Sequence, residues 1–166
     1  MEDAAIPAVD ISSEVAEPAA ALWLAVTTPR GVNAELMPFI RMTFPEADMR
    51  LADAPLDTPL FGSWIFLFGV LPFDRHTFVI HEVGARHFVE TSRSLLQKLW
   101  RHERSLTETA GGTIIRDVVT VIPRFSFAAP ATNFVVRAIF RHRHRRLARL
   151  YGAAQEKPAG PHRRAF

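Results

Sequence analysis

The sequence predicts an α+β domain in which an antiparallel sheet is followed by one long C-terminal helix. Residues 62–123 are rich in Val, Ile, Phe, Thr and Trp and are interrupted only by short turn signals, which is typical of successive strands. Residues 130–151 instead place apolar side chains three and four positions apart, the period of an amphipathic helix. A chain of 166 residues is long enough to bury a real core. We therefore expect one domain over residues 1–152 and a disordered basic tail over residues 153–166.

The N-terminal part of the chain predicts a strand, two short helices and a second strand. In residues 6–15 apolar and polar side chains alternate, the pattern of a half-buried strand. The Ala- and Leu-rich segment 17–27 favours a helix, with Pro18 in its first turn. After a Pro and a Gly, residues 31–36 allow a second short helix, and residues 39–45 are compatible with a strand.

Residues 46–60 form a Pro-, Asp- and Ala-rich stretch without a clear period, which predicts a long loop. Long ordered loops in compact domains are often functional, so this loop is a candidate lid over a binding site. An ordinary surface connection is the alternative interpretation.

The middle of the chain divides into about five strand segments with hairpin turns at residues 83–86 and 109–112, which predicts an antiparallel meander. A loop of two or four residues in the second turn puts even-numbered residues of one strand on the same face as odd-numbered residues of the next. The face with more apolar bulk, which we expect to point inward, carries Trp100, His102, Arg104, Leu106, Thr113, Ile115, Asp117, Val119 and Val121.

Three ionisable side chains therefore fall on the inward face, with Asp117 close to Arg104 or His102. A lone buried carboxylate is strongly unfavourable, and pairing with a cation offsets much of the penalty. Ligand pockets combine mostly apolar walls with a few convergent polar groups, so this set suggests a cavity. The alternative is a structural ion pair between Arg104 and Asp117 at the sheet edge, with His102 a satisfied core histidine.

The C-terminal end carries the positive charge of the chain. Residues 137–166 hold nine Lys and Arg and one Glu, a net charge of +8, whereas the remainder has a net charge of −5. The apolar positions that we expect to face the sheet are Phe134, Val135, Ala138, Ile139, Leu147, Leu150 and Tyr151. The segment "RHRHRRLAR" at 141–149 is either a solvated helix face whose late cations suit the helix C-terminus, or a contact for anionic headgroups. The acidic remainder argues against nucleic acid as a partner.

Several classes of protein are disfavoured. No apolar run approaches the roughly 20 residues of a membrane span, and the acidic N-terminal stretch lacks the layout of a signal peptide, so we expect a cytoplasmic protein. The chain has no cysteine, phosphate-binding loop, HExxH motif or Gly-x-Ser-x-Gly elbow, and His142 and His144 point to different faces of a helix. The sequence predicts neither a metal nor a cofactor, and nothing in it predicts an oligomeric state.

Five segments carry a resemblance to a known superfamily, from about residue 5 to 152. They are "ALWLAVTTPRGVN" at 21–33, "FGVLPFDRH" at 68–76, "LWRHERSL" at 99–106, "GGTIIRDVVTVIP" at 111–123 and "IFRHRHRRLARLYG" at 139–152. In this order the chain resembles the START-like, polyketide cyclase/dehydrase (SRPBCC) superfamily. The resemblance implies a helix-grip fold, a curved antiparallel sheet wrapped around a long C-terminal helix with a hydrophobic cavity between them. It implies no particular reaction, because the superfamily includes lipid carriers, hormone binders and cyclases.

Two functions follow as hypotheses. The first is binding or carriage of a hydrophobic small molecule, with Trp100, Phe88 and Val119 lining the cavity and Arg104, His102 and Asp117 at its polar end. The second is a polyketide cyclase- or dehydratase-like enzyme in which His102 acts as acid or base, Asp117 orients it and Arg104 holds an enolate or carboxylate. A ring nitrogen of His102 that faces open cavity would favour the enzyme, and a fully satisfied His102 would favour the binder.

Overall fold

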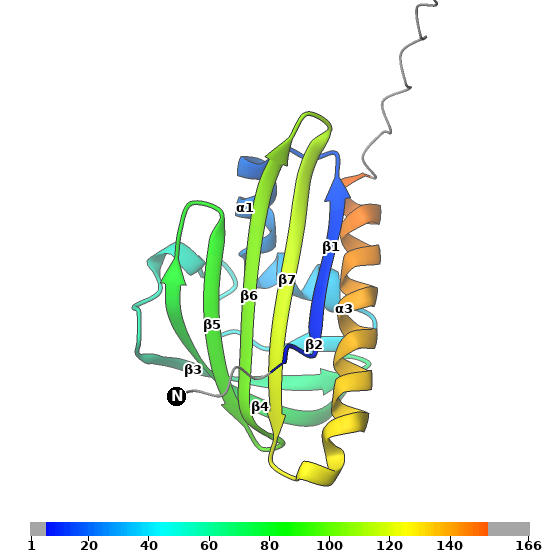
Figure 1. The fold of residues 1–166 in the computed structure, drawn as a ribbon. Coiled ribbons are helices and arrows are strands. Elements are labelled where there is room, and N and C mark those ends of the chain that lie inside the picture. The colour runs from blue at the N-terminus through cyan, green and yellow to red at the C-terminus, as the bar shows by residue number, and fades with distance from the viewer. Residues whose placement is uncertain (1–5, 153–166) are drawn as a thin grey trace, which may run out of the picture.

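The structure is a computed structural model that describes residues 6–152, whose seven strands form one curved antiparallel sheet in the order β1-β7-β6-β5-β4-β3-β2 (Figure 1). The elements in chain order are β1 (Val9–Val15), α1 (Ala19–Val26), α2 (Pro29–Leu36), β2 (Ile40–Met42), η1 (Leu51–Asp53), β3 (Pro59–Leu67), β4 (Leu71–Val83), β5 (His87–Ser94), β6 (Gln97–Thr109), β7 (Gly112–Pro123), η2 (Ser126–Ala128) and α3 (Ala129–Tyr151). Strands β3 to β7 form the predicted meander, and β1 and β2 extend its two edges. This arrangement confirms the predicted fold class.

The β6–β7 hairpin has a two-residue loop, one of the two lengths for which even-numbered residues of β6 and odd-numbered residues of β7 share a face. Thr109 pairs with Gly112, and Arg104 pairs with Asp117. Gly112 has φ of 144°, and a Cβ atom there would lie 1.9 Å from the Val15 carbonyl oxygen, so only glycine fits the start of β7. The predicted inward face of the two strands is the buried face, with Trp100 and Val121 at its half-buried end.

Two short helices connect β1 to β2 and bring the end of α2 over the sheet. Pro18 immediately precedes α1 instead of lying in its first turn. Thr28 caps α2, because its side-chain oxygen accepts a hydrogen bond of 3.1 Å from the backbone N–H of Gly31. Leu22 of α1 packs in a core cluster with residues of β1, β6, β7 and α3. This packing positions the last turn of α2, which carries Glu35, above the sheet.

Helix α3 packs against β1, β7 and α2 with a face that agrees only in part with the predicted one: Leu147 is buried and Ile139 and Tyr151 pack against the core, as expected. Ala138 was expected to face the sheet and is exposed, as are Phe134, Val135 and Leu150, at 68%, 49% and 44%. The buried residues of α3 are Val136, Phe140, Arg143, His144 and Leu147. The physical reason is that Asp117 and Glu35 lie opposite this face and pair with its two basic side chains, which favours this rotation of the helix over a purely apolar contact.

Two further expectations concern the ends and the surface of the chain. The basic tail expected at residues 153–166 lies outside the described residues. Within residues 6–152, no helix has both the length and the apolar character that crossing a membrane requires.

Candidate functional site

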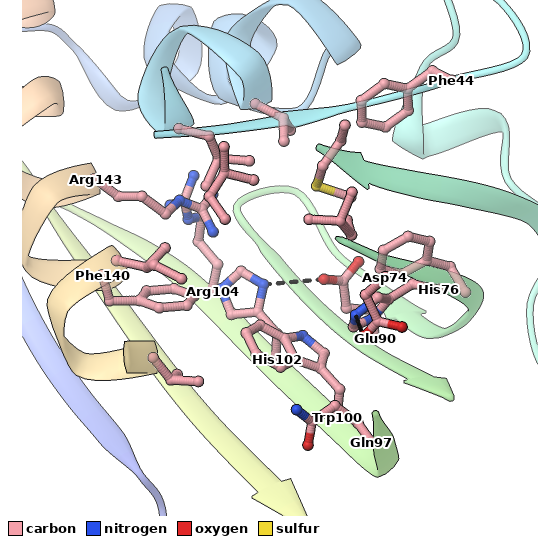
Figure 2. Close-up of a pocket in the computed structure, with 18 of the residues that line it drawn as sticks. Phe44, Asp74, His76, Glu90, Gln97, Trp100, His102, Arg104, Phe140 and Arg143 are labelled. Atoms are coloured by element: carbon pink, nitrogen blue, oxygen red, sulfur yellow. Dashed lines mark hydrogen bonds and ion pairs between the residues drawn. The ribbon is translucent and has the colours of Figure 1, made fainter. Parts of the chain in front are cut away.

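A cavity of about 440 Å³ lies between the sheet and α3 (Figure 2). Small-molecule sites span roughly 300–1,000 Å³, so its size suits an organic ligand. Most of its wall is apolar, and its aromatic side chains are Phe44, Phe61, Phe73, Phe78, Phe88, Trp100, Phe125 and Phe140. A mostly apolar wall with few polar groups favours a hydrophobic occupant.

The cavity reaches solvent at the end of the sheet where β6 begins and β7 ends. The wall residues that are themselves exposed are Phe73, Phe125, Ala131 and Val135. They come from the start of β4, from the connection between β7 and α3, and from the first turns of α3. The loop at 46–60 contributes half-buried wall residues such as Met49 and Leu51, so it forms part of one side of the cavity.

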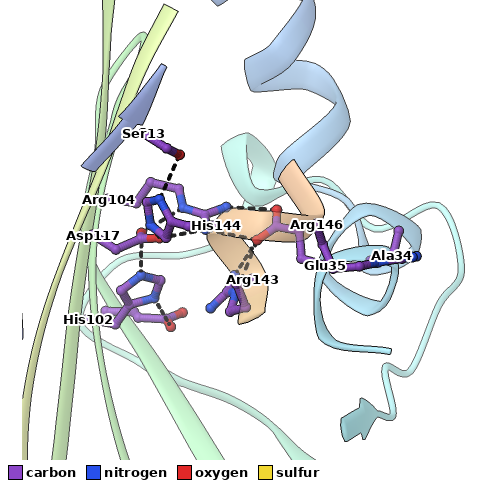
Figure 3. A network of polar contacts seen from close by, with 10 residues as sticks. Ser13, Ala34, Glu35, His102, Arg104, Asp117, Arg143, His144 and Arg146 are labelled. Carbon is purple, nitrogen blue, oxygen red and sulfur yellow. Dashed lines mark hydrogen bonds and ion pairs between the residues drawn. The ribbon is translucent and has the colours of Figure 1, made fainter. Parts of the chain in front are cut away.

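Asp117 is the centre of a buried polar network on the sheet side of α3 (Figure 3). Its carboxylate accepts hydrogen bonds from Arg104 Nε at 2.7 Å and Arg104 Nη2 at 2.8 Å. His102 Nε2 lies 2.8 Å away and His144 Nε2 lies 3.0 Å away. Burial alone would raise the pKa of Asp117, but the charge of Arg104 and these hydrogen bonds hold that pKa well below its usual range.

Glu35 is the second buried carboxylate of the network and joins α2 to β6 and α3. It accepts two hydrogen bonds from Arg104, of 2.9 and 2.8 Å, and two from Arg143, of 3.1 and 2.8 Å. Burial opposes ionisation of Glu35, but the two guanidinium charges outweigh it and lower the pKa. Arg104 therefore carries a carboxylate on each side, an arrangement that keeps all three groups charged in a water-poor interior.

His102 lies between two carboxylates and links the network to the cavity. Its Nε2 faces Asp117, and its Nδ1 lies 3.1 Å from Glu90 Oε1. Carboxylate oxygens only accept hydrogen bonds, so both contacts are satisfied when the ring is the doubly protonated imidazolium. Burial alone would lower the pKa of His102, but the hydrogen bonds and charges of Asp117 and Glu90 raise it above 6.5.

These shifts predict a stability maximum at mildly acidic pH. The raised pKa of His102 stabilises the fold fully below pH 6.5, and this contribution is lost as the pH rises through the folded-state pKa. The lowered pKa values of Glu35 and Asp117 act in the opposite sense: their contribution is present above pH 4.5 and is lost as the pH falls. Urea unfolding measured across acidic, neutral and alkaline pH should show both losses. His102→Gln should remove the alkaline loss and keep the acidic one. An unchanged alkaline loss in this variant would contradict the assignment.

A second polar cluster lies nearer the mouth. His76 Nδ1 is 2.7 Å from Ser92 Oγ, and His76 Nε2 is 3.3 Å from Asp74 Oδ2. The other oxygen of Asp74 accepts hydrogen bonds from two backbone N–H groups, those of Arg75 and Leu95. Asp74 and His76 belong to the cavity wall, but their polar atoms already have partners within the protein.

The structure brings four of the six residues predicted for the site to the cavity wall, namely Phe88, Trp100, His102 and Arg104. Asp117 is buried behind the wall, where it contacts His102 and Arg104. Val119 contributes to a core cluster with Val9 and residues of α3 and is absent from the wall.

Sequence reasoning missed four ionisable side chains of the network, namely Glu35, Glu90, Arg143 and His144. The β5–β6 register, in which Glu90 pairs with His102, was the one local signal that could have found Glu90. Glu35 and Arg143 are 108 positions apart in the chain, so no spacing rule connects them.

The curved sheet, the long C-terminal helix and the apolar cavity between them define a helix-grip fold of the START-like type, as the resemblance implied. A START superfamily protein from Mycobacterium smegmatis has a TM-score of 0.64 at 10% identity, covering 86% of this chain and 95% of that one. DynU16, a protein of the dynemicin biosynthetic locus, has a TM-score of 0.55 at 18% identity, covering 88% of this chain and 48% of that one. Ara h 8.0201 has a TM-score of 0.52 at 14% identity, covering 82% and 93%. Likeness at these identities shows the fold.

The chain belongs to the family described as "Domain of unknown function (DUF8410)", whose profile matches residues 13–151. No curated protein matches the sequence.

Proposed function

We propose that this protein binds or carries a hydrophobic small molecule in the cavity between the sheet and α3. The observation that carries the proposal is the cavity itself, about 440 Å³ of mostly apolar space with a mouth between β4, the β7–α3 connection and α3. Burial of apolar ligand surface, at about 25 cal/mol per Å², would supply most of the affinity. The START-like fold supports the proposal because it is built around such a space.

The state of His102 favours a binder over a cyclase-like enzyme. A general acid or base must reach the proton that it transfers. Both ring nitrogens of His102 are occupied, by Asp117 and by Glu90. The two carboxylates raise the pKa of the ring and contact both of its nitrogens, so His102 offers no free nitrogen to the cavity. The polar network thus supports a structural role beside an apolar binding space.

A ligand panel combined with a plugged mouth tests the proposal. Fatty acids, flavonoids and polycyclic aromatic probes should raise the melting temperature for at least one class. Ala131→Trp places an indole at the mouth and should weaken binding of that class at least about tenfold. Ala138→Trp is the matched control, because Ala138 is exposed on the same helix but is not part of the wall. A panel without any thermal shift, or equal affinities for the two variants, would contradict a ligand in this cavity.

We also propose that α3 contacts anionic headgroups through an exposed stripe of arginines. Arg137, Arg141, Arg145 and Arg149 are exposed and recur every four residues, so they share one face of the helix. No carboxylate of residues 6–152 forms an ion pair with any of them. Arg143 and His144, in contrast, are buried, so within 141–149 the proposed contact falls on Arg141, Arg145 and Arg149, and Arg137 extends it by one turn.

Charge reversal tests the stripe. Arg141→Glu combined with Arg145→Glu should weaken binding to vesicles of phosphatidylcholine with phosphatidylglycerol by at least roughly 30-fold, since loss of each cation near an anionic surface costs about 1 kcal/mol and the new carboxylates add repulsion. Arg30→Glu combined with Arg50→Glu, which changes two exposed arginines elsewhere, is the control. Equal co-sedimentation of the two double variants with the anionic vesicles would contradict the contact. So would an unaltered protein that binds pure phosphatidylcholine as strongly as the anionic vesicles.

A further inference from the structure

One polar group of the cavity has no hydrogen-bond partner among the described residues. Gln97 belongs to the cavity wall, and its side-chain oxygen Oε1 is buried without a hydrogen-bond partner among residues 6–152. Leaving a buried acceptor unsatisfied is unfavourable, and natural proteins do so rarely. A bound molecule with a hydrogen-bond donor would remove this penalty.

The position of Gln97 says where that donor would lie. Gln97 is the first residue of β6 and pairs with Pro123, the last residue of β7, beside the mouth. Figure 2 shows Gln97 next to Trp100 at one end of the group of side chains, with Arg104 and Arg143 farther along the cavity. The polar group of the ligand would therefore sit near the mouth, and its apolar body would extend inward past Trp100.

The charges of the wall exclude an anionic ligand. Arg104 is already paired with Asp117 and Glu35, and Arg143 with Glu35. His102 is held by two carboxylates. A ligand carboxylate would thus meet no unpaired cation among the described wall residues and would lose its hydration without replacement.

Two carboxylates belong to the wall itself. Asp74 and Glu90 line the cavity, and the Glu90 side chain is 18% exposed. They would repel an anionic group and can accept hydrogen bonds from a neutral one. This arrangement also differs from the expectation that Arg104 and His102 would meet the polar end of a ligand, because both side chains already bind carboxylates of the protein.

We propose that the cavity selects neutral ligands in which an apolar body carries an alcohol or phenol hydroxyl, and that the carboxamide of Gln97 binds this hydroxyl. A hydroxyl both donates and accepts, so it matches the oxygen and the N–H groups of the carboxamide. The inference rests on the proposed function and adds the ligand class to it.

Three fluorescent probes that share one ring system distinguish the proposed binding of a hydrophobic molecule from the proposed hydroxyl contact with Gln97. Pyrenemethanol carries the hydroxyl, ethylpyrene is its apolar isostere, and pyrenecarboxylate is the anion. Titration of the full chain should give pyrenemethanol at least about tenfold tighter than pyrenecarboxylate. Gln97→Met, which keeps the size of the side chain, should lower the affinity ratio of pyrenemethanol to ethylpyrene about fivefold or more. Lys98→Met, at the adjacent exposed position, should leave that ratio unchanged.

The outcomes are distinguishable. If ethylpyrene binds and Gln97→Met leaves the ratio unchanged, the hydroxyl contact is wrong and the apolar site stands. If pyrenecarboxylate binds as tightly as pyrenemethanol, the selection for neutral ligands is wrong. If none of the three probes binds and the wider panel gives no thermal shift, both the hydroxyl contact and the proposed function are overturned.

Discussion

Asp117→Ala should lower the free energy of unfolding by about 3–5 kcal/mol, the range for removing one partner of a buried ion pair. The Asp117 carboxylate is completely buried and contacts three basic side chains, those of Arg104, His102 and His144. Without it, the Arg104 guanidinium loses two of its four hydrogen bonds in this network and retains those to Glu35. Urea unfolding at neutral pH measures the loss.

The chain contains a matched control for this change. Asp10 pairs with Arg116 through two hydrogen bonds of 2.9 and 2.7 Å, but both side chains are about half exposed. Exposed pairs contribute about 0–1 kcal/mol, so Asp10→Ala should have a small effect. Asp117→Asn keeps the shape of the side chain and should lower the free energy of unfolding by an intermediate amount. It takes the place of Asp117→Ala if the alanine variant does not fold. A loss below about 0.5 kcal/mol for Asp117→Ala would place the network in solvent.

Glu35→Ala should be comparably destabilising, by about 3–5 kcal/mol, because it leaves two guanidinium groups short of partners. Glu35 is completely buried. Among the described residues of α2, it alone accepts hydrogen bonds from both Arg104 and Arg143. Its loss should therefore loosen the packing of α2 on α3 and leave the buried network with one negative charge fewer. Hydrogen exchange of the α2 amides is the measurement that shows the local effect.

A double-mutant cycle identifies the cause of this loss. Arg143→Leu removes one of the cations, so Glu35→Leu combined with Arg143→Leu should cost less than the sum of the single changes, with a coupling of about 0.5–3 kcal/mol. Glu108→Ala, which breaks an exposed pair with Arg86, is the control and should change stability by less than about 1 kcal/mol. Additive single changes would show that Glu35 acts without Arg143.

Local patterns were sufficient for most of the fold. The alternation in residues 9–15, the turn signals of the meander and the two-residue loop before Gly112 all act over a few positions, and each describes the observed strands. Because side chains alternate strictly along a strand, one correct turn length placed Asp117 and Arg104 on the same buried face. The contact between these two side chains follows directly from that register.

The sequence by itself therefore determined the class of fold, the meander and the inward face of β6 and β7, because these depend on short periods and short turns. Only the tertiary structure decided which face of α3 is buried and which groups complete the network. The helical period predicted an apolar stripe through Phe134 and Val135, whereas the helix turns Arg143 toward Glu35, 108 positions away. The physical reason is that a buried carboxylate must find a cation, and that requirement acts between segments that only the fold brings together.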